Sequence, residues 1–431
     1  MAGEKTVLVV GGGISGITSA VEAAEAGCKV ILVERQPYLG GRVARMNKYF
    51  PKLCPPTCGL EINFKRIRKN PDITVYTLAN VESVSGNAGN YTVTIKINPR
   101  YVEDHAATSK CVEDCPAEIS NEFNYGMNKC KAVRLPYEMA YPMSLVADAD
   151  ALRAVNGTDL GAFMESCKAK GIRLDLEAKP ETFSVDVQSI VWATGWVPYD
   201  ATKLDKLGFG KYPNVITNVM MERLANVGGP TAGAIVRPSD GKKVNNLAFV
   251  QCAGSRDENH LPYCSSICCL ASLKQATYLR DYNPDAQAHI FYIDLRAYGR
   301  FEFFFDRVRA DEKIILTKGK IVNITEDPAT KDVIVEGEDI MSGEKIRRTF
   351  DMVVLATGMQ PTTSLEKIPF SGVEYDEFGF LVSDNGIHAA GVTKRPMDVG
   401  TCLQDATGAA LKALQDTDRK STRLNSSHRI R

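Results

Sequence analysis

The 431-residue sequence lacks several features that would assign it to common protein classes. Neither sign of charge is in excess, because 52 Lys and Arg residues balance 52 Asp and Glu residues, and this argues against nucleic-acid binding, which normally needs a basic surface. No uninterrupted apolar run approaches the roughly 18 residues that would span a bilayer. An apolar run starts at Thr6 and leaves no room for a secretory signal, so we expect a cytoplasmic protein.

Histidine is scarce, and hydrolytic chemistry has no support in the sequence. The five histidines show no metal-ligand spacing, and no Ser/His/Asp arrangement stands out. Cysteine, in contrast, is abundant, with 12 residues. In a cytosolic chain of this length, clustered cysteines more often hold metal or carry redox chemistry than form structural disulfides.

A glycine-rich turn follows the first apolar run. Residues 6–10 (TVLVV) predict a buried strand, 11–16 (GGGISG) contain a GxGxxG motif, 14–26 predict a helix, and 29–33 predict a second strand that ends in Glu34. This unit predicts dinucleotide binding, with pyrophosphate at the helix N-terminus and the ribose hydroxyls on the acidic residue. We expect cofactor contacts from Gly11, Gly13, Ile14, Ser15, Gly16, Glu34 and Arg35.

The rest of the chain favours FAD over NAD in this unit. Two strand-then-turn segments recur, at 190–195 (IVWATG) and 353–358 (VVLATG), and 387–391 (IHAAG) precedes a Gly/Ala-rich helical stretch from Asp405. The arrangement resembles the two-dinucleotide-domain flavoproteins of the thioredoxin reductase and glutathione reductase type. That resemblance implies an α/β fold whose first domain binds FAD. It also implies further contacts from Gly41, Arg42, Thr194, Gly195, Gly358 and Gly391, although Val392 replaces the Asp that usually follows the last glycine.

The same resemblance predicts the domain organisation. Residues 1–200 are expected to form the first part of the FAD-binding domain, with an insertion over 46–140, and 201–350 a second Rossmann-like domain. Residues 351–415 are expected to return to the FAD-binding domain. The polar and basic stretch 416–431 is expected to be a non-native tail.

The expected second domain has no glycine fingerprint. Between residues 200 and 350 there is no GxGxxG motif, and four cysteines lie instead within 18 residues. Structural zinc prefers CxxC pairs, whereas adjacent cysteines point apart and suit different irons of one cluster. We therefore interpret Cys252, Cys264, Cys268 and Cys269 as ligands of a [4Fe-4S] cluster beside a helix N-terminus. Buried or disulfide-bonded cysteines, or a zinc site, are the alternatives.

This C-x11-C-x3-C-C pattern resembles that of the A-type subunit of heterodisulfide reductase and its relatives. Four segments, 40–45, 254–257, 264–274 and 294–299, resemble more closely the A-type subunit of the quinone-interacting membrane-bound oxidoreductase complex of sulfate-reducing bacteria. The methanogen protein is longer and has extra ferredoxin-like domains, which favours the quinone-linked relative. The resemblance implies FAD and a [4Fe-4S] cluster as cofactors. It also implies that Lys274 is a catalytic residue near the reactive edge of the flavin. Without the resemblance, a lysine in a helix is usually a solvated surface residue.

The resemblance also implies partners for an electron-transfer subunit. These are a second flavin and iron–sulfur subunit, a membrane haem b subunit that contacts menaquinone, and adenylylsulfate reductase, with membrane contact only through a partner. Two other functions stay open. One is an NAD(P)H-dependent flavin disulfide reductase that uses Cys54 and Cys58. The other is a flavin-bearing scaffold without turnover.

Two further segments carry weaker signals. Cys111 and Cys115 match the second half of a bacterial ferredoxin motif, C-x3-C-P, and we interpret them as a decayed cluster site. The aromatic residues of 301–305 predict a helix that contacts a partner, although such a face is more often part of the core.

Overall fold

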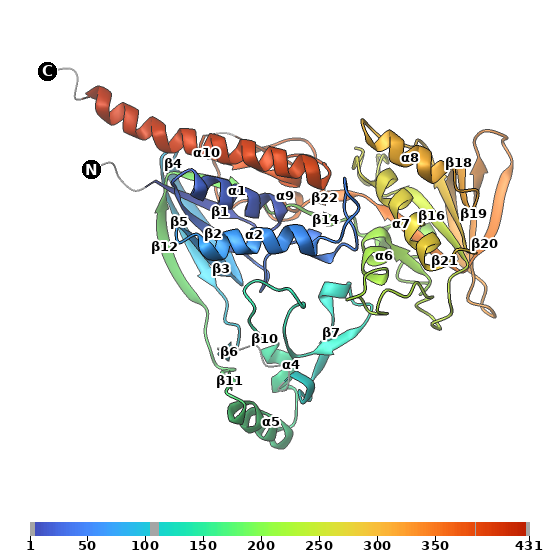
Figure 1. Cartoon of the computed structure of the whole chain (residues 1–431), viewed down its shortest axis with the longest axis horizontal. Helices are drawn as coiled ribbons and strands as arrows, with labels where there is room; N and C mark the ends of the chain where they lie inside the picture. The colour runs from blue at the N-terminus through green and yellow to red at the C-terminus, as the bar shows by residue number, and fades with distance from the viewer. Residues whose placement is uncertain (1–4, 104–111, 384, 428–431) are drawn as a thin grey trace.

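The computed structural model describes residues 5–103, 112–383 and 385–427. Two sheet-based domains lie side by side, and a smaller lobe projects from between them (Figure 1). Cys111 lies outside the described residues.

A five-stranded parallel sheet forms the centre of the first domain. Its strand order is β25–β13–β1–β2–β3, so segments from both ends of the chain assemble it. Alternate residues of its central strand face two cores: Val7 and Val9 face one, and Leu8 and Val10 face the other. The strands are β1 (Thr6–Val10), β2 (Lys29–Glu34), β3 (Ile73–Thr77), β13 (Ser189–Trp192) and β25 (Ile387–Ala389).

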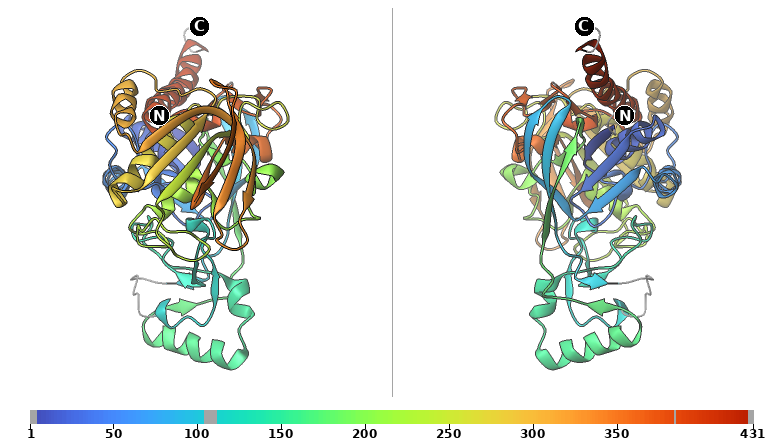
Figure 2. Two further views of the ribbon diagram at one scale, coloured as in Figure 1. Left: turned by 90° about the vertical axis from the view of Figure 1, so that its right-hand side faces the viewer. Right: turned by 90° about the vertical axis from the view of Figure 1, so that its left-hand side faces the viewer.

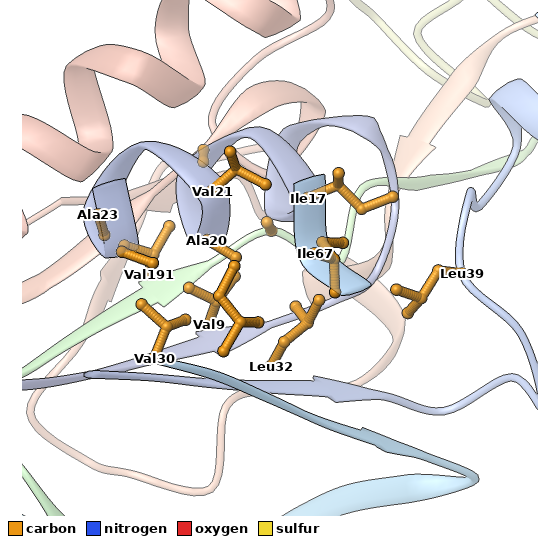
Figure 3. Packing of buried hydrophobic residues seen from close by; sticks show 14 of the residues in the cluster. Val9, Ile17, Ala20, Val21, Ala23, Val30, Leu32, Leu39, Ile67 and Val191 are labelled. Carbon is orange, nitrogen blue, oxygen red and sulfur yellow. The ribbon is translucent and has the colours of Figure 1, made fainter. Parts of the chain in front are cut away.

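Three helices cover one face of this sheet: α1 (Ile14–Glu25), α2 (Thr57–Lys69) and α10 (Val399–Ser427). Figure 3 shows Ile17, Ala20 and Val21 of α1 over the strands, and these side chains are almost fully buried. Small residues on α1 and α10 let these helices pack closely against each other. The last helix begins at Val399, six residues before the expected start at Asp405, and continues to Ser427, within the stretch expected as a non-native tail.

The other face of the sheet is covered by three antiparallel strands in the order β12–β5–β4. They are β4 (Ala79–Asn87), β5 (Asn90–Ile97) and β12 (Glu181–Val187). Because β3, β4 and β5 belong to these two sheets, most of the range 46–97, expected as the start of an insertion, is part of the first domain. The short strand β3 joins the sheet through parallel pairing with β2, a contact that alternation along its own sequence does not reveal.

The lobe lies between β5 and β12 and extends beyond the expected end of the insertion at residue 140. It has its own small core, which includes Cys115 and Leu152. Its elements are β6 (Val102–Glu103), β7 (Glu118–Ser120), the 3-10 helix η2 (Glu122–Asn124), β8 (Lys129–Lys131), β9 (Val133–Arg134), β10 (Val146–Ala147), α4 (Ala149–Arg153), α5 (Gly157–Ala169) and β11 (Arg173–Leu174).

The second domain is built on a seven-stranded sheet in the order β15–β21–β16–β17–β18–β19–β20, seen face-on in the left view of Figure 2. Pairing is parallel from β15 to β18 and antiparallel from β18 to β20. Helices α6 (Asn218–Leu224), α7 (Cys268–Tyr282) and α8 (Phe301–Arg309) pack on one face. The strands are β15 (Val215–Thr217), β16 (Asn246–Ala253), β17 (Gln287–Tyr292), β18 (Ile314–Glu326), β19 (Val333–Asp339), β20 (Lys345–Phe350) and β21 (Met352–Thr357).

The two crossings between the domains pair with each other. Strand β14 (Trp196–Pro198) leaves the first domain and runs antiparallel to β22 (Met359–Pro361), which returns to it. The returning segment adds α9 (Thr362–Leu365), β23 (Glu374–Tyr375) and β24 (Leu381–Val382). The structure therefore has the expected α/β architecture with two Rossmann-like domains. None of the described helices combines the length and the apolar character needed to cross a membrane.

Candidate active site

A cavity of about 520 Å³ lies where the two domains and the lobe meet. This volume is within the range of sites that hold small molecules and cofactors. Its wall combines the turn after β1, the end of β2, the segment after it, both domain crossings, one face of α7 and the start of α10. Of the residues expected to bind the cofactor or to be catalytic, those that line the cavity are Gly11, Gly13, Ile14, Ser15, Glu34, Arg35, Gly41, Arg42, Thr194, Gly195 and Lys274.

The glycines of the first turn leave no space for side chains. Gly11 has φ +106°, and a Cβ added there would lie 2.4 Å from the carbonyl oxygen of Ala193. A Cβ on Gly16 would lie 1.7 Å from the oxygen of Gly11. A Cβ on Gly41 would lie 2.8 Å from the Cα of Gly13, so two backbone segments approach each other closely at the cavity wall. The turn thus exposes backbone N–H groups to the cavity at the start of α1, as an anion site requires.

Glu34 is buried at the end of β2. Its carboxylate accepts hydrogen bonds from the backbone N–H of Gly12 at 2.5 Å and of Gln36 at 2.7 Å. Burial raises the pKa of this carboxyl group, although the two N–H donors oppose the shift. Thr194, across the cavity, has a buried hydroxyl with no hydrogen-bond partner among the described residues. These acceptor and donor groups fit the hydroxyl-rich part of a dinucleotide.

Three expected contact residues do not line the cavity. Gly16 packs against Gly11, as described above. A Cβ on Gly358 would lie 2.2 Å from the hydroxyl of Ser255, so this glycine faces the cysteine-bearing loop of the second domain. Gly391 donates its N–H to Asp405 at 2.9 Å, and a Cβ there would lie 2.0 Å from the hydroxyl of Ser15. These two glycines act through packing that supports the wall.

Lys274 forms a buried ion pair on the cavity wall. Its ammonium lies 3.0 Å from Oε1 of Glu222, and the two side chains are only 6% and 8% exposed. It also donates a hydrogen bond to the carbonyl of Lys48 at 2.5 Å. The carboxylate of Glu222 accepts further hydrogen bonds from Gln275 at 2.8 Å and from the Tyr278 hydroxyl at 3.2 Å. Both charges are therefore fixed in position beside the cavity.

The four cysteines of the second domain gather where β16 ends and α7 begins. Cys252 lies at a bulge in β16, between Val250 and Ala253, and adopts φ +57°. Cys268 and Cys269 form the first turn of α7, and Cys264 lies in the loop that joins the two elements. Gly254, Arg256 and Ser266 in that loop also have positive φ values. A concentration of such strained conformations is typical of functional sites.

The four residues are free thiols that influence one another. Burial, with smaller contributions from Cys269 and Cys264, raises the pKa of the Cys252 thiol to about 11. Burial also raises the pKa of Cys268 and of Cys269, again with contributions from neighbouring thiols. Without a metal the thiols of Cys252, Cys268 and Cys269 stay protonated at neutral pH, and a nearby cation would be needed to stabilise their thiolates.

The four cysteines do not form a ready-made site for a single metal ion. Within residues 5–103, 112–383 and 385–427, no group of three or more His, Cys, Asp or Glu side chains converges on one metal position. A tetrahedral zinc ion would hold its sulfur ligands about 4 Å apart. A [4Fe-4S] cluster has each thiolate on a different iron and so needs ligands that are more widely spaced. The amide of Gln251, next to Cys252, is buried without a hydrogen-bond partner among the described residues and adds an unused polar group here.

Helix α7 connects the cysteines to the cavity. Cys268 and Cys269 occupy its first turn, whereas Ile267, Ala271, Lys274 and Gln275 line the cavity. These four positions follow helical spacing and form one face of the helix. Two of the four clustered cysteines and one wall of the cavity therefore belong to a single helix.

Comparison with known proteins agrees with this geometry. Residues 6–51 match the sequence family described as FAD dependent oxidoreductase. An A-type iron–sulfur subunit of CoB–CoM heterodisulfide reductase from Methanopyrus kandleri is 38% identical over 422 residues, which are 94% of this chain and 63% of that protein. The corresponding subunit from Methanocaldococcus jannaschii is 36% identical over 426 residues, with 94% and 63% coverage. The chain is therefore similar to the A-type subunits of heterodisulfide reductase over most of its length, and its first 51 residues include a segment that matches the FAD dependent oxidoreductase family.

The chain spans just under two thirds of the length of these relatives. Among solved structures, thioredoxin reductase from Lactococcus lactis has a TM-score of 0.53 at 14% identity and covers 96% of this chain and 100% of its own. At that identity the likeness shows the fold alone. It confirms the expected two-domain flavoprotein architecture.

Cys54 and Cys58 lie beside the cavity. Tyr49 lines the cavity, and its N–H donates a hydrogen bond to the carbonyl of Cys54 at 3.1 Å. Burial raises the pKa of the Tyr49 hydroxyl, and the thiols of Cys54 and Cys58 raise it further. Cys58 is exposed in the first turn of α2. The structure thus places both thiols close to the cavity without joining them in a disulfide.

Several cavity residues are not evident from the sequence. Glu222 lies in a short helix with no motif around it, and only the fold brings it to Lys274. Arg45 and Tyr125 also line the cavity, although Tyr125 belongs to the lobe. Asp398 could have been found, because its carboxylate accepts the N–H of Thr401 at 3.1 Å in a helix N-cap pattern that is visible in the sequence.

Proposed function

We propose that the chain is an electron-transfer protein that holds FAD in the cavity and a [4Fe-4S] cluster on Cys252, Cys264, Cys268 and Cys269. The observation that carries this proposal is the position of α7, which contributes two of the cysteines and one wall of the cavity. The relatives are named as iron–sulfur subunits of heterodisulfide reductase, which supports the cluster.

Flavin exchanges electrons in pairs and an iron–sulfur cluster exchanges them singly, so the two together convert one mode into the other. The chain supplies the environment for this exchange. The backbone N–H of Gly13, at the start of α1, faces the expected pyrophosphate, whereas that of Gly11 donates to the carbonyl of Val33 at 2.8 Å. Glu34 is placed to accept hydrogen bonds from the ribose. The ammonium of Lys274, fixed by Glu222, provides positive charge at the wall and would stabilise an anionic reduced ring.

We further propose that the protein acts in a membrane-associated complex that links menaquinone to adenylylsulfate reductase. Its partners would be a membrane haem b subunit together with a second flavin and iron–sulfur subunit. The resemblance of 40–45, 254–257, 264–274 and 294–299 to the A-type subunit of the quinone-linked complex supports this assignment. Direct transfer to a heterodisulfide, as in the names of the relatives, is the competing assignment within the same family.

A disulfide reductase that uses NAD(P)H is the alternative reaction. The contact of Tyr49 with Cys54 favours it, because it brings a pair of thiols near the cavity. Against it, the turn after β16 carries cysteines where a glycine fingerprint would bind the pyrophosphate of NAD(P)H. This alternative predicts that NADH or NADPH rapidly bleaches the flavin absorbance, whereas our proposal predicts no bleaching by either nucleotide.

Cofactor analysis of anaerobically purified protein tests the proposal. We expect about one flavin, four irons and four acid-labile sulfides per chain. Replacement of Cys268 and Cys269 by Ser should remove the iron and sulfide and retain the flavin, because neither residue lines the cavity. Replacement of the half-buried Cys130 by Ser, in the lobe, is the control and should retain both cofactors. Flavin accompanied by zinc, or by no metal, would refute the cluster.

A further inference from the structure

Three arginines converge on the side of the cavity that faces the lobe. Arg42 follows Gly41, Arg45 lies one turn later, and Arg223 belongs to α6 of the second domain. We call them the arginine cluster. Arg42 and Arg45 line the cavity, and the side chain of Arg223 is almost fully buried, at 3% exposure.

Aromatic rings hold the guanidinium groups of the cluster close together. Arg45 and Arg223 both lie over the ring of Phe123, with their guanidinium carbons 5.4 and 4.7 Å from its centre. Arg45 also lies over Tyr125, at 5.3 Å, and Arg42 donates a hydrogen bond to the hydroxyl of Tyr125 at 3.3 Å. The lobe therefore contributes the two rings around which charges from both domains gather.

No carboxylate in the described part of the chain forms an ion pair with the arginine cluster. Arg45 donates to the Tyr38 hydroxyl at 2.7 Å, and Arg223 donates to the side-chain oxygen of Asn124 at 2.8 Å, and both acceptors are neutral. The neighbouring Glu222 is occupied, because Lys274 pairs with it. Burial, together with the charge of Arg45, lowers the pKa of Arg223 to about 10, which still leaves it protonated at neutral pH.

Backbone carbonyls of Trp196, Glu122 and Gly228 also accept hydrogen bonds from the cluster, so its donors are satisfied by neutral groups and a bound anion would offset the remaining repulsion. Charges taken out of water are normally paired, and three like charges in one place repel one another. Guanidinium groups bind phosphate, sulfate and carboxylate groups through two parallel hydrogen bonds, and the hydroxyl of Tyr125 offers another donor. The FAD pyrophosphate is expected at the start of α1, where Arg42 is also an expected cofactor contact, but no contact of Arg223 reaches that turn. Arg45 and Arg223 are therefore the charges of the cluster that remain for another anion.

We propose that the arginine cluster, with Tyr125, binds the phosphate, sulfate or carboxylate group of a second ligand beside the flavin. The proposal rests on the assignment of FAD to the cavity. It gives the protein a place for an anionic substrate or effector in contact with both domains and the lobe. Binding there would also hold the lobe against the cavity.

Titration of the flavin-loaded protein with sodium sulfate and with potassium phosphate, at constant ionic strength, tests this site. Calorimetry and the flavin absorbance spectrum are the readouts. We expect one saturable site, weakened about ten-fold or more by Arg45→Gln and by Arg223→Gln, because each removes a charged hydrogen-bond donor. Arg223→Lys should weaken it less, and Arg347→Gln, at an exposed ion pair in β20, should leave it unchanged.

Flavin and iron are measured in the same samples, so that the two proposals can fail separately. Normal flavin and iron contents with no saturable anion binding would overturn the second site alone. The site would also be refuted if anions bound only after FAD removal and both Gln variants lost FAD, because the FAD phosphates would then occupy the cluster. Wild-type protein that carries no flavin would overturn the proposed function itself.

Discussion

Removal of the Lys274 ammonium should destabilise the protein by about 3 kcal/mol. Loss of one partner from a buried ion pair costs roughly 3–5 kcal/mol, because the other charge is left without compensation. The pair here is well buried, with side chains 6% and 8% exposed. Glu222 would keep its hydrogen bonds from Gln275, Tyr278 and the backbone of Asn47, which places the cost at the lower end.

Thermal unfolding followed by far-UV circular dichroism measures this effect. For Lys274→Met we expect a melting temperature lower by on the order of 6–12 °C, since 1 kcal/mol corresponds to about 2–4 °C in a domain of this size. The double variant Lys274→Met/Glu222→Gln should recover much of the loss, because no buried charge remains. The control Lys168→Met breaks a solvent-exposed pair with Glu165 and should change stability by less than about 1 kcal/mol.

Two results would contradict this reasoning. Lys274→Met could melt at the same temperature as Lys168→Met, which would show that the ion pair contributes nothing to stability. Alternatively, the double variant could be no more stable than Lys274→Met alone. The loss would then come from packing of the lysine side chain and not from an uncompensated carboxylate.

Three other outcomes follow from the structure. Gly16→Ala should abolish flavin binding, measured by absorbance, because its Cβ would lie 1.7 Å from a backbone oxygen. The control Gly161→Ala in α5 should retain the flavin, because a Cβ there meets nothing within 4 Å. Burial raises the pKa of Cys402 to about 12, so iodoacetamide at pH 8 should alkylate the exposed Cys58 and spare Cys402 in peptide mass analysis. Burial lowers the pKa of His289 from 6.5 to about 4. At pH values between these two pKa values the unfolded chain therefore binds more protons than the folded protein. Stability should therefore fall as pH decreases from about 6.5 to 4, by at most ~3 kcal/mol, and His289→Gln should flatten this dependence in chemical denaturation.

Features that depend on short stretches of sequence could be predicted. The turn after β1 is determined by glycines whose positions exclude side chains, and a strand, helix and strand around it are read directly from periodicity. The parallel sheet, the two crossings and the position of the cysteines next to the start of a helix follow in the same way. Most of the expected cofactor contacts consequently lie on the wall of one cavity.

Features that arise from pairing between distant segments could not be predicted. The strand β3 looked like part of an insertion because only its parallel pairing with β2 identifies it as part of the sheet. Glu222 and Arg223 have no motif, since their significance comes from neighbours supplied by another domain or by the lobe. Gly358 belongs to a recognisable turn, but its contact with Ser255 shows that it supports the cysteine loop.

The central claim is that sulfur ligands of iron occupy the place where related folds would bind a nicotinamide nucleotide. A diffraction data set collected at the iron absorption edge, from crystals grown without oxygen, tests it most directly. We expect an anomalous peak surrounded by Cys252, Cys264, Cys268 and Cys269 at the start of α7, with FAD in the adjacent cavity. A nicotinamide nucleotide at that position, with the four sulfurs free of metal, would contradict the account.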